Sequence, residues 1–258
     1  MARGCPVEAM ILAAGVGKRL RPHTDRTPKA LVEVAGIPMI ARVARRLIEA
    51  GAERIVINLH HHAAQIEEYV RERDEFGVEV LFSREPEAPL ETGGGLLAAA
   101  GLFQKRAPFF LHNVDVICDA DLAAMYATHR SRSPIATLAV NRRETSRPLL
   151  VDDDGFRGLA NRGTGWRAEA RPARGRTREI GFAGIHVLSP DVFSRITERG
   201  RFSIMDVYLR LAAEGCLIDT FDVSDALWLE VGDPKRLERA RRALAVGGEP
   251  EEEEPLDA

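Results

Sequence analysis

The sequence predicts an α/β protein in which helices cover both faces of a doubly wound, Rossmann-like mixed sheet. Three observations favour this fold. Short apolar runs alternate with stretches of helical periodicity through the first half of the chain, which is the pattern of βαβ units. A loop containing Gly15 and Gly17 directly follows the first apolar run. Hydrophobic residues make up 45% of the 258 residues, enough for a proper core in one large domain.

Strands and helices are expected to alternate in the first half. The first helix is the clearest, because Ile40, Val43 and Leu47 share one helical face and Gly51 follows as a C-cap. The expected strands are 10–13, 55–59, 78–82, 109–115 and 135–140, and the expected helices are 40–48, 63–73, 94–104 and 121–130. Ligands bind at the carboxyl ends of the strands in such sheets. Because the Gly15 loop and Asp115 both fall at such ends, we expect them to share one site.

The second half of the chain is less regular. Residues 141–179 are rich in Arg, Asp and Gly and contain a turn at 152–155, which predicts a hairpin and then a mobile loop at 161–178. Strands are expected at 181–188, 217–223 and 228–231, and helices at 191–198, 203–214 and 234–245. No hexapeptide repeat is present, so no C-terminal β-helix is expected.

The loop after the first strand has the chemistry of a triphosphate site. Small residues let the backbone approach a phosphate closely, and successive N–H groups beside Lys18, Arg19 and Arg21 make an anion cradle. Two common phosphate loops are excluded. A P-loop needs Ser or Thr after Gly-Lys, where this chain has Arg19. A dinucleotide fingerprint needs a third glycine, where this chain has Leu20.

The string A-G-x-G-x-R-L-x-P-x-T-x-x-x-P-K is matched at every spacing from Ala14 to Lys29. It resembles the signature loop of the sugar-1-phosphate nucleotidylyltransferases. The resemblance implies a GT-A-like nucleotidyltransferase fold. It implies that Arg19 favours the departing pyrophosphate and that Lys29 bridges the phosphates, both as catalytic residues. The nucleotide-binding residues that it implies at this loop are Leu12, Ala13, Ala14, Gly15, Gly17 and Lys18.

Two carboxylates are candidates for holding Mg²⁺, which takes one or two carboxylates together with substrate phosphates. Asp115 follows an apolar strand, and the family has a metal-binding aspartate there, preceded by Gly where this chain has Val114. The run W-L-E-V-G-D resembles the family's W-x-D-V-G-T, which puts Glu230 at the second metal position. Asp119, Asp121 and Asp233 are interpreted as helix caps.

A second glycine cluster, PLETGGG at 89–95, precedes a helix whose free N–H groups we expect to face a ligand. The string LETGGG is similar to that of the N-acetylmuramate-1-phosphate uridylyltransferases. That resemblance implies that Glu91, Thr92 and Gly94 contact the base, although a tight helix entry explains the same residues. The strand at Gly184 resembles the family strand beside the sugar, and Asn161 is a further sugar-side candidate.

Composition limits the partners and the compartment. The net charge of −3 argues against a nucleic-acid surface, and no apolar run approaches the about 20 residues of a membrane span. The amino terminus has no signal-peptide h-region, and Cys5, Cys118 and Cys216 form neither a metal pair nor a disulfide framework, so a reducing cytoplasm is expected. The tract His60–His62 is expected to bind no metal, because adjacent side chains on a strand point to opposite faces.

Together these features predict a catalytic domain at 1–246 and a disordered acidic tail at 247–258. The expected reaction is Mg²⁺-dependent transfer of a nucleotidyl group from an NTP to a sugar 1-phosphate, giving an NDP-sugar for the cell envelope and pyrophosphate. UTP with an amino-sugar phosphate is the leading pair. A choline-phosphate-type cytidylyltransferase and a non-catalytic nucleotide- or sugar-binding regulator stay open as alternatives. The protein is expected to be a monomer or a small homo-oligomer.

Overall fold

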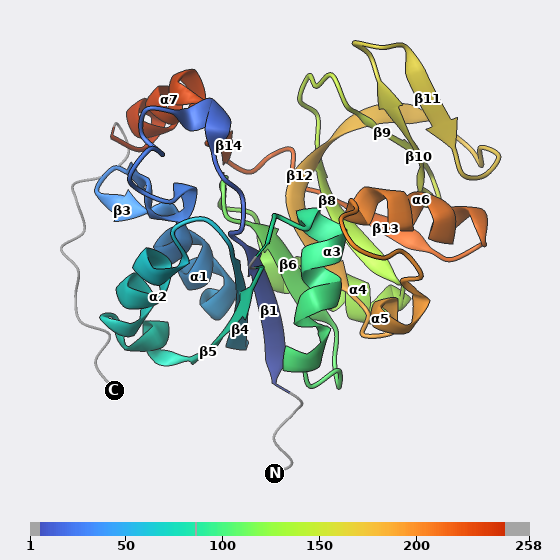
Figure 1. The fold of residues 1–258 in the computed structure, drawn as a ribbon. Coiled ribbons are helices and arrows are strands. Elements are labelled where there is room, and N and C mark those ends of the chain that lie inside the picture. The colour runs from blue at the N-terminus through green and yellow to red at the C-terminus, as the bar shows by residue number, and fades with distance from the viewer. Residues whose placement is uncertain (1–5, 86, 246–258) are drawn as a thin grey trace.

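Four parallel strands in the order β5-β4-β1-β6 form the half of the sheet that contains the amino-terminal loop (Figure 1). The computed structural model describes residues 6–85 and 87–245. The strands are β1 (Val7–Leu12), β4 (Ala52–Leu59), β5 (Glu79–Arg84) and β6 (Phe109–Asn113). Side chains alternate between the faces of β1, so Ala9 and Ile11 enter one core and Met10 enters the other.

Strand β12 (Arg178–Leu188) runs antiparallel to β6 and makes the sheet mixed. Its carboxyl part also pairs with β8 (Ala136–Asn141), which is parallel to β13 (Ile218–Asp222). Its amino part pairs with a three-stranded meander of β9 (Leu149–Asp152), β10 (Gly155–Asn161) and β11 (Trp166–Glu169). The structure thus confirms the predicted mixed α/β sheet.

Helices cover both faces of this sheet, as a doubly wound fold requires (Figure 1). One face buries α1 (Met39–Glu49), α2 (Ala63–Arg71), α4 (Leu122–Arg132) and α7 (Pro234–Ala245). The other buries α3 (Glu91–Ala98), α5 (Val192–Arg195) and α6 (Ile204–Ala213). Helix α1 forms where the sequence predicts it because its apolar stripe, Ile40, Val43 and Leu47, is fully buried.

A small antiparallel ribbon brings the end of the chain to the carboxyl end of β6. It consists of β7 (Val116–Cys118) and β14 (Trp228–Glu230), with Glu230 opposite Val116. A second ribbon, β2 (Glu33–Val34) and β3 (Ile37–Pro38), leads into α1. Helix α7 follows β14 directly, and its first turn is capped by Asp233, which accepts the Arg236 amide at 2.9 Å, as predicted.

Several sequence-based boundaries are wrong. The loop expected at 161–178 contains strand β11, which pairs with β10 along its length. The helix expected at 94–104 begins at Glu91 and ends at Ala98. The strand expected to reach Asp115 ends at Asn113, so Asp115 lies in the turn before β7. Asp119 accepts the Leu227 amide at 2.7 Å instead of capping α4, a role that Asp121 fills at 2.8 Å.

Within the described residues, no helix is long and apolar enough to cross a bilayer. Cys118 is buried, and both Cys118 and Cys216 are free thiols. Cys5 and the tail expected at 247–258 lie outside the described residues.

Candidate active site

The loop after β1 is closed by one glycine that no other residue replaces easily. Gly17 has φ 66°, and a Cβ there would lie 2.9 Å from Cγ2 of Thr24. The Thr24 hydroxyl donates to the Gly17 carbonyl at 2.8 Å and holds the loop folded back on itself. Gly15 has open space around it. The loop therefore presents exposed backbone at Gly15, while Ala13 and Ala14 are buried beneath it.

Lys29 and Asp115 meet at the centre of the site. Lys29 Nζ lies 2.5 Å from Asp115 Oδ2, although the two residues are 86 positions apart in the chain. They meet because β1 and β6 are parallel neighbours, so the segments that follow their carboxyl ends share one edge of the sheet. Both side chains are mostly buried, which strengthens the electrostatic interaction between them relative to a pair in water.

The second candidate carboxylate is held beside the first by the β7–β14 ribbon. The Val231 amide donates to the Asp115 carbonyl at 2.8 Å, which places Glu230 next to Asp115 along the backbone. The Glu230 carboxylate forms an ion pair with the Arg236 guanidinium from the first turn of α7. The W-L-E-V-G-D run predicts Glu230 at this position, whereas no sequence pattern points to Arg236, which lies on the next element.

Arg19 reaches the same place from the glycine loop. Gly232 follows the β14 ribbon, and a Cβ built on it would lie 2.9 Å from Glu230 Oε1 and 3.4 Å from Arg19 Nη2. Arg19 is therefore beside Glu230 although it belongs to the first loop of the chain. The structure brings Arg19, Lys29, Asp115 and Glu230 together. Lys18 and Arg19 are both exposed on the loop.

The donor set fits Mg²⁺ in its chemistry. Two carboxylates from adjoining backbone segments would supply hard oxygen ligands, and Mg²⁺ in proteins takes its other ligands from phosphates and water. No cluster of three or more His, Cys, Asp or Glu side chains capable of holding a metal occurs in the described part of the chain. Val114, where the family has Gly, is 5% exposed and packs in the core.

A buried polar network behind the glycine loop was missed by the sequence analysis. Asn58, at the end of β4, accepts the Ala13 amide at 2.7 Å and donates to Glu85 at 2.7 Å. The other Glu85 carboxylate oxygen accepts the Leu90 amide at 2.7 Å. Both side chains are 2% exposed. The network ties the loop after β1 to the loop that enters α3. Its only sequence signal is two polar residues at the ends of apolar strands.

The glycine cluster of α3 serves close packing. The amides of Gly93 and Gly94 both donate to the Phe202 carbonyl, at 3.0 and 3.2 Å, so these two N–H groups are not free as expected. The Thr92 hydroxyl accepts the Ile204 amide at 2.9 Å, and Glu91 forms an ion pair with Arg201 at 2.8 Å. This geometry is the tight helix entry foreseen as the alternative. The predicted base contacts of Glu91, Thr92 and Gly94 stay predictions.

The two sugar-side candidates lie in different places. Gly184, with φ 84°, packs β12 against the end of β6, since a Cβ there would lie 2.8 Å from Val116 Cγ2 and 3.2 Å from Asn113 Nδ2. Gly184 therefore lies close to the turn that carries Asp115, between Asn113 and Val116. Asn161 lies at the β10–β11 turn, where its side chain accepts the Gly163 amide at 3.0 Å. Strands β9 and β12 separate β10 from β6 in the sheet.

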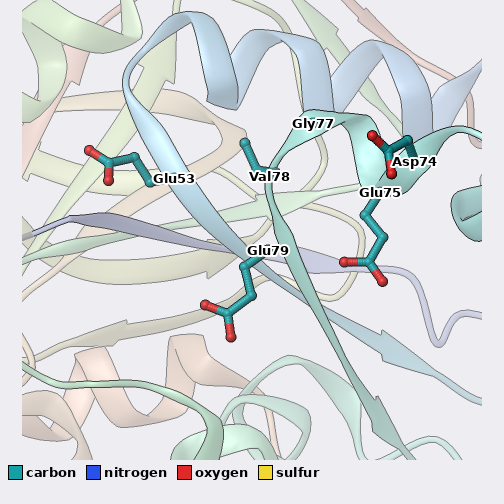
Figure 2. Close-up of a pocket in the computed structure, with 6 residues that line it drawn as sticks. All are labelled: Glu53, Asp74, Glu75, Gly77, Val78 and Glu79. Carbon is teal, nitrogen blue, oxygen red and sulfur yellow. The ribbon is translucent and has the colours of Figure 1, made fainter. Parts of the chain in front are cut away.

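A hollow of about 500 Å³ lies at the opposite edge of the sheet (Figure 2). It is lined by Glu53, Asp74, Glu75, Gly77, Val78 and Glu79. Glu53 and Glu79 are at the amino ends of β4 and β5, whereas the glycine loop follows the carboxyl end of the parallel strand β1. Its carboxylates therefore do not belong to the site around Asp115.

Comparisons with known proteins find relatives over nearly the whole chain. The family model described as nucleotidyl transferase matches residues 8–246. An N-acetylmuramate alpha-1-phosphate uridylyltransferase of Caulobacter vibrioides is 33% identical over 93% of this chain and 98% of its own length. A protein of the same name from Neisseria meningitidis serogroup B is 34% identical over the same shares. The mannose-1-phosphate guanylyltransferase catalytic subunit beta of Drosophila pseudoobscura pseudoobscura is 33% identical, and the match spans 90% of this chain and 61% of that protein.

Solved structures show the same fold. A UTP-bound UGPase from Acinetobacter baumannii superposes with a TM-score of 0.78 over 94% of each chain, at 18% identity. An inositol-1-phosphate CTP transferase from T. maritima gives a TM-score of 0.72 over 95% of this chain and 99% of that chain, at 20% identity.

Proposed function

Because the chain belongs to the nucleotidyl transferase family, we propose that it transfers a nucleotidyl group from an NTP to a sugar 1-phosphate and releases pyrophosphate. The meeting of Lys29 and Asp115 between the glycine loop and the β7–β14 ribbon carries this proposal. It puts a fixed cation and a carboxylate, with Arg19 nearby, where the backbone at Gly15 is exposed. A reaction between two anions needs this combination of alignment and neutralised charge.

The reaction requires no covalent bond to the protein and no general base. The sugar phosphate oxygen is already ionised, so it attacks the α-phosphorus without a general base. The new bond to the α-phosphorus forms as the bond to the bridging oxygen of the β-phosphate breaks, and pyrophosphate leaves. Lys29 stabilises negative charge on the phosphate oxygens as this happens, and Arg19 neutralises the departing pyrophosphate. The glycine loop orients the triphosphate through its backbone amides.

Asp115 and Glu230 would hold the metal. Mg²⁺ held there would supply a Lewis acid for the charge on the phosphoryl oxygens. The Lys29 ammonium keeps the Asp115 carboxylate in one orientation, and Arg236 does the same for Glu230. Both cations limit the repulsion between the carboxylates and the incoming phosphates.

We further propose UTP and an amino-sugar 1-phosphate as the substrates. Two observations support this pair: the LETGGG run at 90–95, and the two relatives named N-acetylmuramate alpha-1-phosphate uridylyltransferase, which match this chain over nearly their whole length. The guanylyltransferase relatives make GTP with mannose 1-phosphate the second pair to test.

The deciding experiment measures pyrophosphate release with UTP, GTP, dTTP and CTP against a panel of sugar 1-phosphates and phosphocholine. We expect turnover with a sugar 1-phosphate, fastest with UTP and an N-acetylated amino-sugar phosphate. Turnover with CTP and phosphocholine alone would replace the proposal with a cytidylyltransferase. Nucleotide binding without turnover of any pair would favour a regulator. EDTA should abolish turnover, and Mg²⁺ should restore it.

A further inference from the structure

Arg143 projects from the loop after β8, and two contacts fix the position of its guanidinium. Its guanidinium carbon lies 4.4 Å from the centroid of the Trp228 ring, on the strand that ends with Glu230. Its Nη2 donates to the Phe182 carbonyl of β12 at 3.0 Å. Trp228 is itself held, because its indole N–H donates to the Ala183 carbonyl at 2.8 Å. The guanidinium is therefore stacked and oriented before any ligand binds.

Arg143 forms no direct ion pair in the part of the chain that the structure describes. Among the ion pairs of the described residues, no carboxylate lies within 4.0 Å of Arg143, in contrast to its neighbour Arg142, which pairs with Asp225 at 3.4 Å. Burial lowers the pKa of the Arg143 guanidinium, the nearby Glu230 raises it, and Arg236 lowers it further. The acidic neighbour, Glu230, is already paired with Arg236, so the half-buried charge of Arg143 is incompletely neutralised. Such a charge favours an anionic ligand, because burying an incompletely neutralised charge is unfavourable.

The surroundings of Arg143 are also short of hydrogen-bond partners. Arg143 Nε is buried and makes no hydrogen bond, and the same holds for Oδ1 of Asn141, a residue that is 6% exposed. The missing side chain of Gly181 leaves the space that these groups occupy. A Cβ at Gly181 would lie 2.7 Å from Arg143 Cγ and 2.9 Å from Asn141 Oδ1. Buried polar groups in native proteins are usually satisfied, so unpaired ones at a strand end indicate a place for a ligand.

We propose that Arg143 binds the phosphate group of the sugar 1-phosphate, an assignment that rests on the proposed function. The glycine loop, Arg19 and Lys29 supply charge on the β1 side of Asp115. Arg143 supplies positive charge from the other side of Asp115, because it follows β8 and contacts β12 and β14. In-line transfer needs the attacking phosphate and the triphosphate to be held separately, with the α-phosphorus between them. A stacked guanidinium offers the planar fork of donors that suits a phosphate.

The test compares Arg143→Gln with Arg142→Gln, a matched control whose side chain is 69% exposed and paired with Asp225. We expect Arg143→Gln to raise the KM for the best sugar 1-phosphate about 10- to 100-fold, the scale of one lost charged hydrogen bond. The KM for the NTP should change by less than about twofold in both variants, as expected for independent sites. Arg143→Lys should fall between Gln and wild type, because it keeps the charge and loses the fork.

Binding gives a second readout that needs no turnover. The chain has two tryptophans, Trp166 and Trp228, so a Trp166→Phe background leaves Trp228 as the only indole. Titration with α-D-glucose 1-phosphate, N-acetylglucosamine 1-phosphate and inorganic phosphate should change its fluorescence saturably. Arg143→Gln should abolish the change, and Arg142→Gln should retain it.

These readouts separate the two proposals. Turnover with an unchanged acceptor KM in Arg143→Gln would overturn the role of Arg143 and leave the proposed function standing. Arg143-dependent binding without turnover of any pair would support Arg143 and overturn the transferase. A wild-type protein that neither turns over nor binds any of these phosphates overturns both. If Arg143→Gln does not fold, Arg143→Lys decides by the same comparison.

Discussion

At the scale of single residues, Lys29 is the group whose loss should affect chemistry most directly. Its ammonium is fixed by Asp115, so it does not have to reorganise when charge moves during the reaction. We expect Lys29→Ala to lower kcat by about 10²- to 10³-fold, the scale for one such donor. Lys105→Ala is the control, because Lys105 lies just before β6, at the opposite edge of the sheet. Near-normal turnover of Lys29→Ala would contradict the catalytic role.

Glu230 stands where the family motif has an aspartate, and it is paired with Arg236. Substitutions of Glu230 that keep or remove its negative charge therefore test its role. Glu230→Asp keeps the carboxylate and should retain activity. Glu230→Gln removes the negative charge from both the ion pair and the metal site, and should lose most turnover. The measurement is the Mg²⁺ dependence of turnover, with Asp225→Asn as an exposed control. Identical curves for wild type, Asp and Gln would leave Asp115 as the only protein ligand and favour the regulator hypothesis.

At the scale of elements, α3 is positioned by the Asn58–Glu85 network, and Gly95 is where this can be tested. A Cβ at Gly95 would lie 2.6 Å from Glu85 Oε1 and 2.7 Å from Asn58 Nδ2. We expect Gly95→Ala to lower the free energy of unfolding by about 1–3 kcal/mol through overpacking. It should also raise the KM for the NTP, because the network holds the Ala13 amide. Chemical denaturation and steady-state kinetics measure the two effects.

Gly101→Ala is the matched control for Gly95→Ala. A Cβ at Gly101 meets nothing within 4 Å, and the residue lies in a helical turn. Replacing glycine by alanine in a helix is favourable by up to about 1 kcal/mol in the absence of clashes. The two substitutions should therefore change stability with opposite signs. A Gly95→Ala protein as stable as Gly101→Ala would show that the network gives way easily and does not position the loop.

The sequence could predict those elements whose signals are local. The glycine loop and α1 follow from spacing and periodicity, and the family motifs single out Lys29 and Asp115, which lie 2.5 Å apart. The sequence could not predict what depends on distant partners. Gly93 and Gly94 look like a ligand-binding helix start until Phe202 accepts their amides. Strand β11 is too polar to show an apolar pattern and forms because β10 offers it a partner.

At the scale of the whole molecule, the site is assembled from chain segments far apart in the sequence. Parallel pairing brings the ends of β1 and β6 together, and the β7–β14 ribbon adds Glu230 and Trp228. The antiparallel strand β12 then joins this parallel half to β8, whose following loop carries Arg143. The cations thus reach the two carboxylates from both sides. The proposed site depends on the mixed sheet as a whole, because no single βαβ unit contains it.

Three buried histidines should make the folded protein sensitive to acid. Burial lowers the pKa of His112 and His129 to about 4 and that of His186 to about 3, from a usual value of 6.5. Below pH 6.5 the unfolded chain binds protons that the folded protein does not, so stability falls as the pH falls towards 4. Each histidine contributes a slope of about 1.4 kcal/mol per pH unit once the pH is well inside that window. The buried carboxylate Asp152, with a pKa of about 2, affects only more acidic solutions.

Urea denaturation between pH 5 and 8 measures this slope directly. We expect the free energy of unfolding to be nearly constant above pH 7 and to decline steeply below pH 6. His129 is the best single position to substitute, because its Nδ1 meets only the Thr137 hydroxyl, at 2.9 Å, and its buried Nε2 has no partner. His129→Gln should reduce the number of protons taken up on unfolding near pH 5 by about one, which lowers the slope. The same substitution at the exposed His23 should leave the slope unaltered. A slope that His129→Gln does not change would mean that protonation of this imidazole is tolerated in the folded core, and the loss of stability in acid would then come from other groups.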